Sequence, residues 1–384
     1  MANSGTANAE TASPETAGDG VADGEASATH ATGAPMKAAG TLHDITPALT
    51  ADRTVHRRLV HKRAVEQVLT TAVAETGGRL LGTAQLPRLH RHYNDTCAPY
   101  YDLLLIGEAA RQTVEAIVHE LLGVPLDARF VISDLGIALT GLDAVRTGPA
   151  PADLHVELEP GRLRRRRDGS VRSLRGTAAC RIGGRDAARF TGTLLFLAGE
   201  SYEDLRADSA PPQAATADSV TPPPADAGTV PPPRCAPAAV GRTDPRNVVI
   251  GGLRTEGTAT VADIVADPQD PVFFDHALDH LPGMLLMEAA RQTALATWAR
   301  THAVPAGRLL ATSCRARFAA FAELSGPVRC RARPTGAGTV AVTVEQHGEP
   351  AAHLEITVDA VPATERPEHE AAPPAPPREN GGAP

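Results

Sequence analysis

The sequence predicts an α+β fold in which one structural unit occurs twice. The hexapeptide Glu-Ala-Ala-Arg-Gln-Thr occurs at residues 108–113 and again at residues 288–293. Each copy lies in a long, mostly apolar segment whose polar residues have helical spacing. Each segment is followed by several stretches of alternating apolar and polar residues, a pattern typical of antiparallel strands. A helix followed by a run of strands, repeated once, indicates a duplicated α+β unit.

Composition separates the parts of the 384-residue chain that can fold from those that cannot. Residues 1–50 contain few large apolar side chains, so they are predicted to be a disordered tail. The same composition, enriched in proline, predicts a proline-rich linker at residues 203–242 and a second disordered tail at residues 362–384. Two blocks that can fold remain, and we expect repeat 1 at residues 51–202 and repeat 2 at residues 243–361.

The two helices are predicted from spacing and from their end signals. Residues 103–122 form the first helix, which Gly123 and Pro125 terminate. Residues 284–298 form the second helix, which follows Pro282-Gly283. Both helices precede a Val-Pro pair, at 124–125 and at 304–305, which strengthens the internal match.

Eight strands are predicted after the helices. They lie at residues 130–139, 154–158, 176–182 and 191–197 in repeat 1, and at 309–318, 328–333, 339–346 and 353–358 in repeat 2. Short turn signals between them indicate antiparallel hairpins. A doubly wound parallel sheet is excluded because it needs a helix between successive strands. One long helix wrapped by an antiparallel sheet is the order of the hotdog fold, so we expect a tandem hotdog that forms an internal pseudo-dimer.

Charge and cysteine usage exclude several classes of protein. The net charge is −8 and the basic residues are nearly all arginine, a composition that does not favour a nucleic-acid binder. No apolar run is long enough to span a membrane, and the polar N-terminus lacks a signal-peptide core, so we expect a cytoplasmic protein. The five cysteines are scattered and never form Cys-x-x-Cys, which argues against a zinc site or a disulfide framework. We therefore expect no metal.

The repeated hexapeptide is either good helix sequence or a functional site. Its glutamate and arginine lie three residues apart, on one otherwise apolar helix face, where a buried charge pair needs a partner or a use. We place both pairs in the first turns of their helices, where free N–H groups and the helix dipole favour an anion or a polarised carbonyl. The candidate residues are Glu108, Arg111, Gln112, Glu288, Arg291 and Gln292.

The segment before the second helix carries a further cluster, Asp275-His276 and Asp279-His280, followed by Pro282-Gly283-Met284. Together with His-Lys-Arg-Ala-Val-Glu-Gln-Val at residues 61–68 and the helix at 103–112, this segment resembles the A-factor synthase family of γ-butyrolactone signal biosynthesis. The resemblance covers both foldable blocks and neither tail. More distantly, Pro-Gly-Met followed by Glu288 is similar to the start of the central helix in hotdog β-hydroxyacyl-carrier-protein dehydratases, where an aligned acid is catalytic.

The resemblance implies an acyltransferase. Members of the family transfer a β-ketoacyl group from an acyl-carrier-protein thioester to the hydroxyl of dihydroxyacetone phosphate, the first committed step toward butanolide, butenolide or furan signals. It also implies a β-ketoacyl-acyl carrier protein or a CoA thioester as donor, no cofactor, and an acyl tunnel along the interface between the paired helices. A homodimer is a further expectation.

Residue roles follow from this chemistry. Glu288, with a pKa raised by burial, is the expected general base, and N–H groups after Gly283 are the expected oxyanion donors. Arg291, with Arg111 second, is expected to bind the phosphate, while His276 and His280 either act on the substrate or cap the helix. Asp275, Gln112 and Gln292 complete the expected substrate-binding set. Because Asp102-Leu103 replaces Pro-Gly in repeat 1, we expect one competent site centred on repeat 2, with Glu108 either assisting it or shaping the acyl channel.

Two other functions stay open at this point. A hotdog dehydratase or thioesterase would act on an acyl thioester without a phosphate substrate, and a silent protein would bind an acyl chain or a lactone without turnover. The arginines at residues 164–167 form either a solvated hairpin edge or a docking surface for an acidic carrier protein. Dinucleotide oxidoreductases, serine hydrolases and zinc proteases lack support because their motifs are absent.

Overall fold

The computed structural model describes residues 49–96, 98–209 and 232–361. The tails predicted at residues 1–50 and 362–384 lie outside the described residues, apart from residues 49–50, and so does the linker between residues 210 and 231. None of the helices in the described ranges is long and apolar enough to cross a membrane.

Both predicted helices are present, as α1 (Leu103–Glu120) and α3 (Gly283–His302). The carboxylate of Asp102 accepts a hydrogen bond of 2.7 Å from the N–H of Leu104 and caps α1, whereas no side chain caps α3 at Pro282. Glu108 and Glu288 are each the sixth residue of their helix. The prediction that they lie beside the free N–H groups is therefore wrong, because only the first four N–H groups of a helix lack an internal partner.

The strands of repeat 1 are β1 (Thr70–Thr76), β2 (Arg79–Leu86), β3 (Arg129–Leu139), β4 (Ala152–Arg165), β5 (Val171–Ile182) and β6 (Arg185–Leu197). Those of repeat 2 are β7 (Ile250–Glu256), β8 (Ala259–Ile264), β9 (Leu309–Phe318), β10 (Val328–Gly336), β11 (Thr339–Gln346) and β12 (Glu349–Ala360). All eight predicted strands are confirmed. The hairpins β1–β2 and β7–β8, which precede the helices, were not predicted because their alanine- and glycine-rich segments lack a clear alternation.

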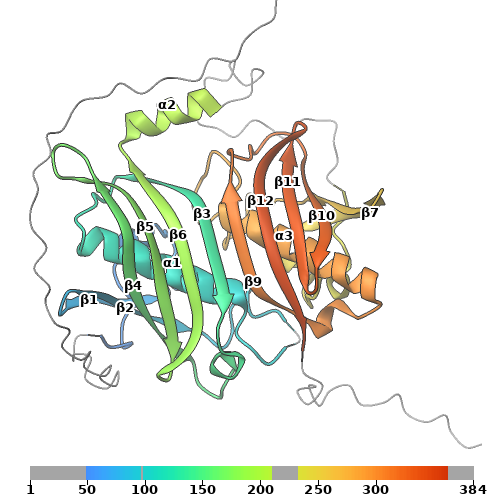
Figure 1. Cartoon of the computed structure of the whole chain (residues 1–384), viewed down its shortest axis with the longest axis horizontal. Helices are drawn as coiled ribbons and strands as arrows, with labels where there is room; N and C mark the ends of the chain where they lie inside the picture. Colours follow the sequence, from blue (N-terminus) through green and yellow to red (C-terminus); the bar gives the residue numbers. More distant parts are fainter. Residues whose placement is uncertain (1–48, 97, 210–231, 362–384) are drawn as a thin grey trace, which may run out of the picture. The chain divides into compact units, whose positions relative to one another are not determined.

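The strands form one antiparallel sheet in the order β1-β2-β4-β5-β6-β3-β9-β12-β11-β10-β8-β7. The second half of this order mirrors the first, and β3 pairs with β9 where the halves meet. Helix α1 packs on the strands of repeat 1 and α3 on those of repeat 2 (Figure 1). Apolar side chains of both helices and of the inner strand faces form one continuous core. The predicted tandem hotdog with an internal pseudo-dimer is confirmed.

The linker predicted at residues 203–242 is shorter than expected at both ends. Helix α2 (Gly199–Ser209) crosses its first boundary, and Arg206 of this helix forms ion pairs with Glu323 at 2.8 Å and with Asp279 at 3.0 Å. At the other end, Arg234 bridges to Gly251 of β7, and Val240 is fully buried. These contacts were missed because a short polar helix among prolines and charges carries no periodic apolar signal.

Candidate active site

The repeated hexapeptide folds into a charge cluster around Glu108 in repeat 1. Oxygen Oε1 of Glu108 accepts hydrogen bonds from Nη2 of Arg111 at 2.7 Å and from Nε2 of Gln112 at 2.9 Å. The Nζ atom of Lys62 lies 3.1 Å from the same oxygen. Burial alone would raise the pKa of Glu108, but the charges of Arg111 and Lys62 outweigh it and hold the pKa well below its ordinary value.

The same cluster recurs around Glu288 in repeat 2, at a constant offset of 180 residues (288 − 108 and 242 − 62). Arg242 takes the place of Lys62, and its Nη2 lies 2.8 Å from Oε1 of Glu288. Arg291 donates to both oxygens of Glu288, at 2.7 and 2.8 Å, and Gln292 donates at 2.5 Å. The prediction of a raised pKa at Glu288 is wrong, because Arg242 and Arg291 outweigh the effect of burial and lower it.

The two glutamines of the hexapeptide fasten each helix to the segment before the first strand. Oε1 of Gln112 accepts from the N–H of Leu69 at 2.8 Å, and Oε1 of Gln292 accepts from the N–H of Val249 at 3.0 Å. Both amides also donate to a backbone carbonyl 45 residues earlier, at Gln67 and at Asn247. The structure thus places Gln112 and Gln292 against glutamate and backbone, and neither lines the large cavity beside Glu108.

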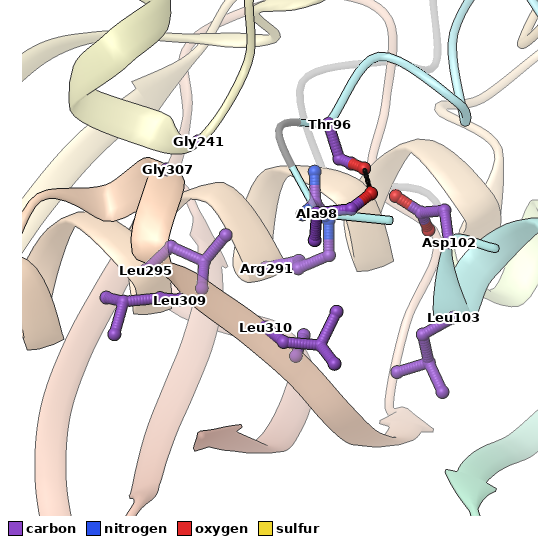
Figure 2. A pocket seen from close by; sticks show the side chains of 11 residues that line it. Thr96, Ala98, Asp102, Leu103, Gly241, Arg291, Leu295, Gly307, Leu309 and Leu310 are labelled. Carbon is purple, nitrogen blue, oxygen red and sulfur yellow. Dashed lines mark hydrogen bonds between the residues drawn. The ribbon is translucent and has the colours of Figure 1, made fainter. Parts of the chain in front are cut away.

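The cluster around Glu288 is closed. Glu288 and the side chain of Arg242 are 0% exposed. Nη1 of Arg242 donates to the carbonyl oxygens of His92 at 2.8 Å and Asp95 at 3.1 Å, and lies 3.6 Å from the carboxylate of Asp102. The cavity beside Arg291 measures only about 20 Å³ and lies between the Asp102 end of α1 and Leu309 and Leu310 (Figure 2). A space of this size holds about one water molecule.

The cluster around Glu108 faces a cavity of about 160 Å³. Its walls come from both repeats: His61, Lys62, Tyr93, Glu108, Arg111, Ile132 and Leu135 from repeat 1, and Val272, Phe273, Asp275, His276, Leu278, Pro282, Gly283, Met284, Met287 and Phe318 from repeat 2. The segment before α3 therefore lies against the glutamate of the other repeat. The large cavity is at Glu108, whereas we had expected a site centred on Glu288.

Asp275 of this segment holds the loop that carries Lys62. Its carboxylate accepts from the N–H groups of Arg63 at 2.5 Å and Ala64 at 2.8 Å. Asp95 of repeat 1 holds the Arg242 loop in the same way, by accepting from the N–H groups of Thr243 and Asp244 at 3.0 Å each. An aspartate of each repeat thus binds the cation-bearing loop of the other repeat. Asp275 itself accepts hydrogen bonds from backbone N–H groups at the cavity edge.

The remaining candidates of this segment separate into two groups. His276 lines the cavity, and its Nδ1 lies 3.5 Å from Oδ2 of Asp275 with no hydrogen-bond partner among the described residues. Gly283 also lines it, at the uncapped start of α3, and a Cβ there would lie 3.2 Å from the ring of Phe318. His280 lies outside the cavity wall and pairs with Asp279 at 2.6 Å.

Lys62 and His61 line the cavity but were not among the predicted site residues. A signal for Lys62 was present, since it and Lys37 are the only lysines in a chain that otherwise uses arginine. His61 carries a positive φ of 52°, and its Nε2 lies 2.9 Å from Nε2 of His119. Nδ1 of His119 faces the carbonyl of Val124 at 2.8 Å. This network assigns the Nε2 proton to His61 and leaves its Nδ1 as an acceptor. Burial, reinforced by His119, lowers the pKa of His61 to about 3.

Glu115 adds a second carboxylate to Arg111 in repeat 1, where repeat 2 has Leu295. Its Oε2 has no hydrogen-bond partner among the described residues. Burial raises the pKa of Glu115 from 4.5 to about 7, despite the nearby charge of Arg111.

The folded protein therefore holds a proton on Glu115 that the unfolded chain releases between pH 4.5 and about 7. Its contribution to stability is present below pH 4.5 and is lost as the pH rises to about 7, by about 2 to 3 kcal/mol. In Glu115→Gln we expect this loss to disappear. Urea unfolding of both proteins between pH 5 and pH 8 measures it, and parallel stability curves would contradict the assigned pKa.

Comparison of the sequence with known proteins identifies a family. The sequence pattern of the A-factor biosynthesis hotdog domain matches residues 43–198 and 226–362. A 2-oxo-3-(phosphooxy)propyl 3-oxoalkanoate synthase of Streptomyces virginiae is 33% identical over 282 residues, which cover 73% of this chain and 87% of the relative. The protein of the same name from Streptomyces coelicolor is 31% identical over 297 residues, which cover 76% of this chain and 87% of the relative. The chain belongs to the A-factor biosynthesis hotdog family.

Proposed function

We propose that this protein transfers a 3-oxoacyl group from a thioester to the hydroxyl of dihydroxyacetone phosphate in the cavity beside Glu108. The observation that carries the proposal is the cavity of about 160 Å³ that joins Lys62 and Arg111 to the uncapped start of α3. The name of the relatives supports it, because a 2-oxo-3-(phosphooxy)propyl 3-oxoalkanoate is the ester that this reaction forms.

The charge of the cavity suits a phosphate. Lys62 and Arg111 contribute two positive charges against the negative charge of Glu108, while the raised pKa of Glu115 reduces its negative charge near neutral pH. A guanidinium fork and an ammonium group are the usual protein ligands of phosphate oxygens. Glu108 has the role of holding both cations in place, since its lowered pKa makes it a weak base.

The start of α3 suits the acyl group. The N–H groups of Gly283 and Met284 are in the first turn, where a helix has no internal acceptors, and both residues line the cavity. They donate to the oxygen of the thioester carbonyl as negative charge develops on it. This assignment keeps the role predicted for Gly283 and joins it to the charged cluster of repeat 1.

His276 is the general base of this proposal, because its imidazole lines the cavity beside the carboxylate of Asp275. It takes the proton of the hydroxyl group as the hydroxyl oxygen attacks the thioester carbon. The carbon–sulfur bond then breaks, the proton passes to the departing thiolate, and the products are the ester and a free thiol. Arg291 and Glu288 have a structural role in repeat 2.

An acyl carrier protein is the proposed donor. Arg164, Arg165 and Arg167 are exposed at the β4–β5 hairpin and present a basic surface that an acidic carrier would contact. A CoA thioester is the simpler donor for an assay. The predicted homodimer stays a prediction.

The test is incubation of the purified protein with a 3-oxoacyl-CoA, with and without dihydroxyacetone phosphate. We expect an ester carrying both groups, together with one free thiol per ester, only when the phosphate substrate is present. Thiol release at the same rate without it would instead establish a thioesterase. Loss of water from a 3-hydroxyacyl thioester would establish a dehydratase, and binding of the acyl group without thiol release would establish a silent binding protein.

A further inference from the structure

Besides the cavities beside Glu108 and Arg291, a small apolar hollow lies beneath α1, against the inner face of the sheet of repeat 1. It is lined by Arg111, Val114, Leu135, Leu158, Leu174, Gly176, Ala178, Phe190, Gly192 and Leu194. All of these residues except Arg111 are apolar or glycine. Arg111 and Leu135 also line the cavity beside Glu108, so the hollow begins where that cavity ends.

A pair of glycines causes the hollow. Gly176 of β5 and Gly192 of β6 pair directly in the sheet. Gly176 lies two residues from the buried Leu174 and Ala178, and Gly192 lies two residues from the buried Phe190 and Leu194. Residues two apart in a strand share a face, so both glycines belong to the row that faces α1. Glycine within a strand weakens it and often marks the close approach of a ligand. Two facing glycines remove two side chains from the floor under α1.

Repeat 2 fills the matching place. The last pairs before the turns are Ile182 with Arg185 in the β5–β6 hairpin and Gln346 with Glu349 in the β11–β12 hairpin. Gly176 lies six residues before Ile182, and Gly192 lies seven residues after Arg185. The same counts from Gln346 and Glu349 lead to the pair Val340–Ile356, which is therefore the counterpart in repeat 2. Both Val340 and Ile356 are 0% exposed. The same sheet position is therefore filled by side chains in repeat 2, where the cluster around Glu288 is closed. It is empty of side chains in repeat 1, where the cluster around Glu108 faces the large cavity.

We propose that the hollow over Gly176 and Gly192 receives the far end of the acyl chain. The inference rests on the proposed function and adds the location of the chain. The chain passes Arg111 and runs beneath α1 within repeat 1, rather than along the interface between α1 and α3. The hollow measures about 20 Å³, room for about one water molecule, so the acyl chain enters it only when leucine side chains of its wall change rotamer over the two glycines.

Gly192→Val tests the proposal. An added Cβ at Gly192 would lie 3.2 Å from the carbonyl oxygen of Asp134 and 4.0 Å from Leu135, whereas one at Gly176 would meet two neighbours at 3.0 and 3.2 Å. Position 192 therefore accepts a side chain at lower strain. The probes are 3-oxoacyl-CoA thioesters from 3-oxobutanoyl to 3-oxododecanoyl, with dihydroxyacetone phosphate as acceptor. We expect 3-oxobutanoyl transfer to be kept and kcat/KM to fall about tenfold or more for chains that reach the hollow.

Leu174→Ala is the opposite change, since it enlarges the hollow from the neighbouring position of β5. We expect it to shift the preferred chain length upward. Ile356→Val, at the position of repeat 2 that matches Gly192, is the control, and its chain-length profile should equal that of the unchanged protein.

Two outcomes separate this proposal from the proposed function. Transfer by the unchanged protein with identical chain-length profiles in Gly192→Val and Leu174→Ala would overturn the hollow and leave the function standing. Absence of transfer to dihydroxyacetone phosphate would overturn the function. In that case thermal stabilisation by the same thioesters, compared across chain length in the same variants, still decides whether the hollow holds the chain. If Gly192→Val does not fold, Leu174→Ala alone decides by the presence or absence of the upward shift.

Discussion

Lys62→Met is expected to lower kcat/KM for transfer to dihydroxyacetone phosphate by about 10²- to 10³-fold while the protein stays folded. The substitution keeps the length of the apolar stem and removes the ammonium group, which lies 3.1 Å from Glu108 at the cavity wall. Glu108 keeps its hydrogen bonds from Arg111 and Gln112, so no buried carboxylate is left without a partner. The loss therefore falls on the substrate phosphate and on the transition state.

Initial rates at varied concentrations of the phosphate substrate measure this effect, and they separate a change of KM from a change of kcat. An unfolding midpoint close to that of the unchanged protein is the control for folding. Full transfer activity in Lys62→Met would remove Lys62 from the proposed site.

Arg242→Met, the same change at the matching position of repeat 2, is expected to lower the free energy of unfolding by about 3 to 5 kcal/mol. Arg242 is fully buried and contacts Glu288 at 2.8 Å and Asp102 at 3.6 Å. Its removal also leaves the carbonyl oxygens of His92 and Asp95 without their guanidinium donor. Losing one partner of a buried charge network costs more than the network contributes when complete, because the remaining groups stay away from water.

Urea unfolding at pH 7 measures this loss, and transfer activity per folded molecule at low temperature is the companion measurement. We expect stability to fall and activity per folded molecule to change little. The reverse result, normal stability with loss of transfer, would move the reaction to the cluster around Glu288. Glu288→Gln belongs to the same class of variants, since it removes the carboxylate that Arg242 and Arg291 both contact inside the protein.

The sequence predicts the fold well because each helix carries a long apolar pattern and each strand after it alternates. It also identifies most of the residues that line the cavity, including Glu108, Arg111, His276 and Gly283. The predicted grouping of these residues was wrong. Proximity in the sequence assigned His276 and Gly283 to Glu288, whereas both line the cavity with Glu108. Antiparallel pairing of β3 with β9 places the segment before α3 over α1 instead, and no local pattern records a contact between the repeats.

The pKa predicted for Glu288 failed for a related reason. Burial was expected from the apolar helix face, and it is observed, but the second cation that opposes it comes from Arg242, 46 residues earlier. The turn that presents Arg242, like the one that presents Lys62, is a short 3-10 segment with a left-handed residue at its end, His61 in one case and Gly241 in the other. Such a turn has no period, so its role appears only when the chain is folded.

The different residues at the two helix starts, Asp102 and Pro282, have a consequence for inheritance. In a protein of two identical subunits, every substitution is made at both ends of the symmetric interface. A mutation that fills the space at one helix start would also fill it at the other. Selection for a stable interface would then oppose selection for a cavity that binds small molecules. One continuous polypeptide removes this conflict, because each position is encoded separately. Here Asp102 caps α1 and lies 3.6 Å from Arg242, whereas Pro282 and Gly283 line the large cavity, a difference that identical subunits cannot encode.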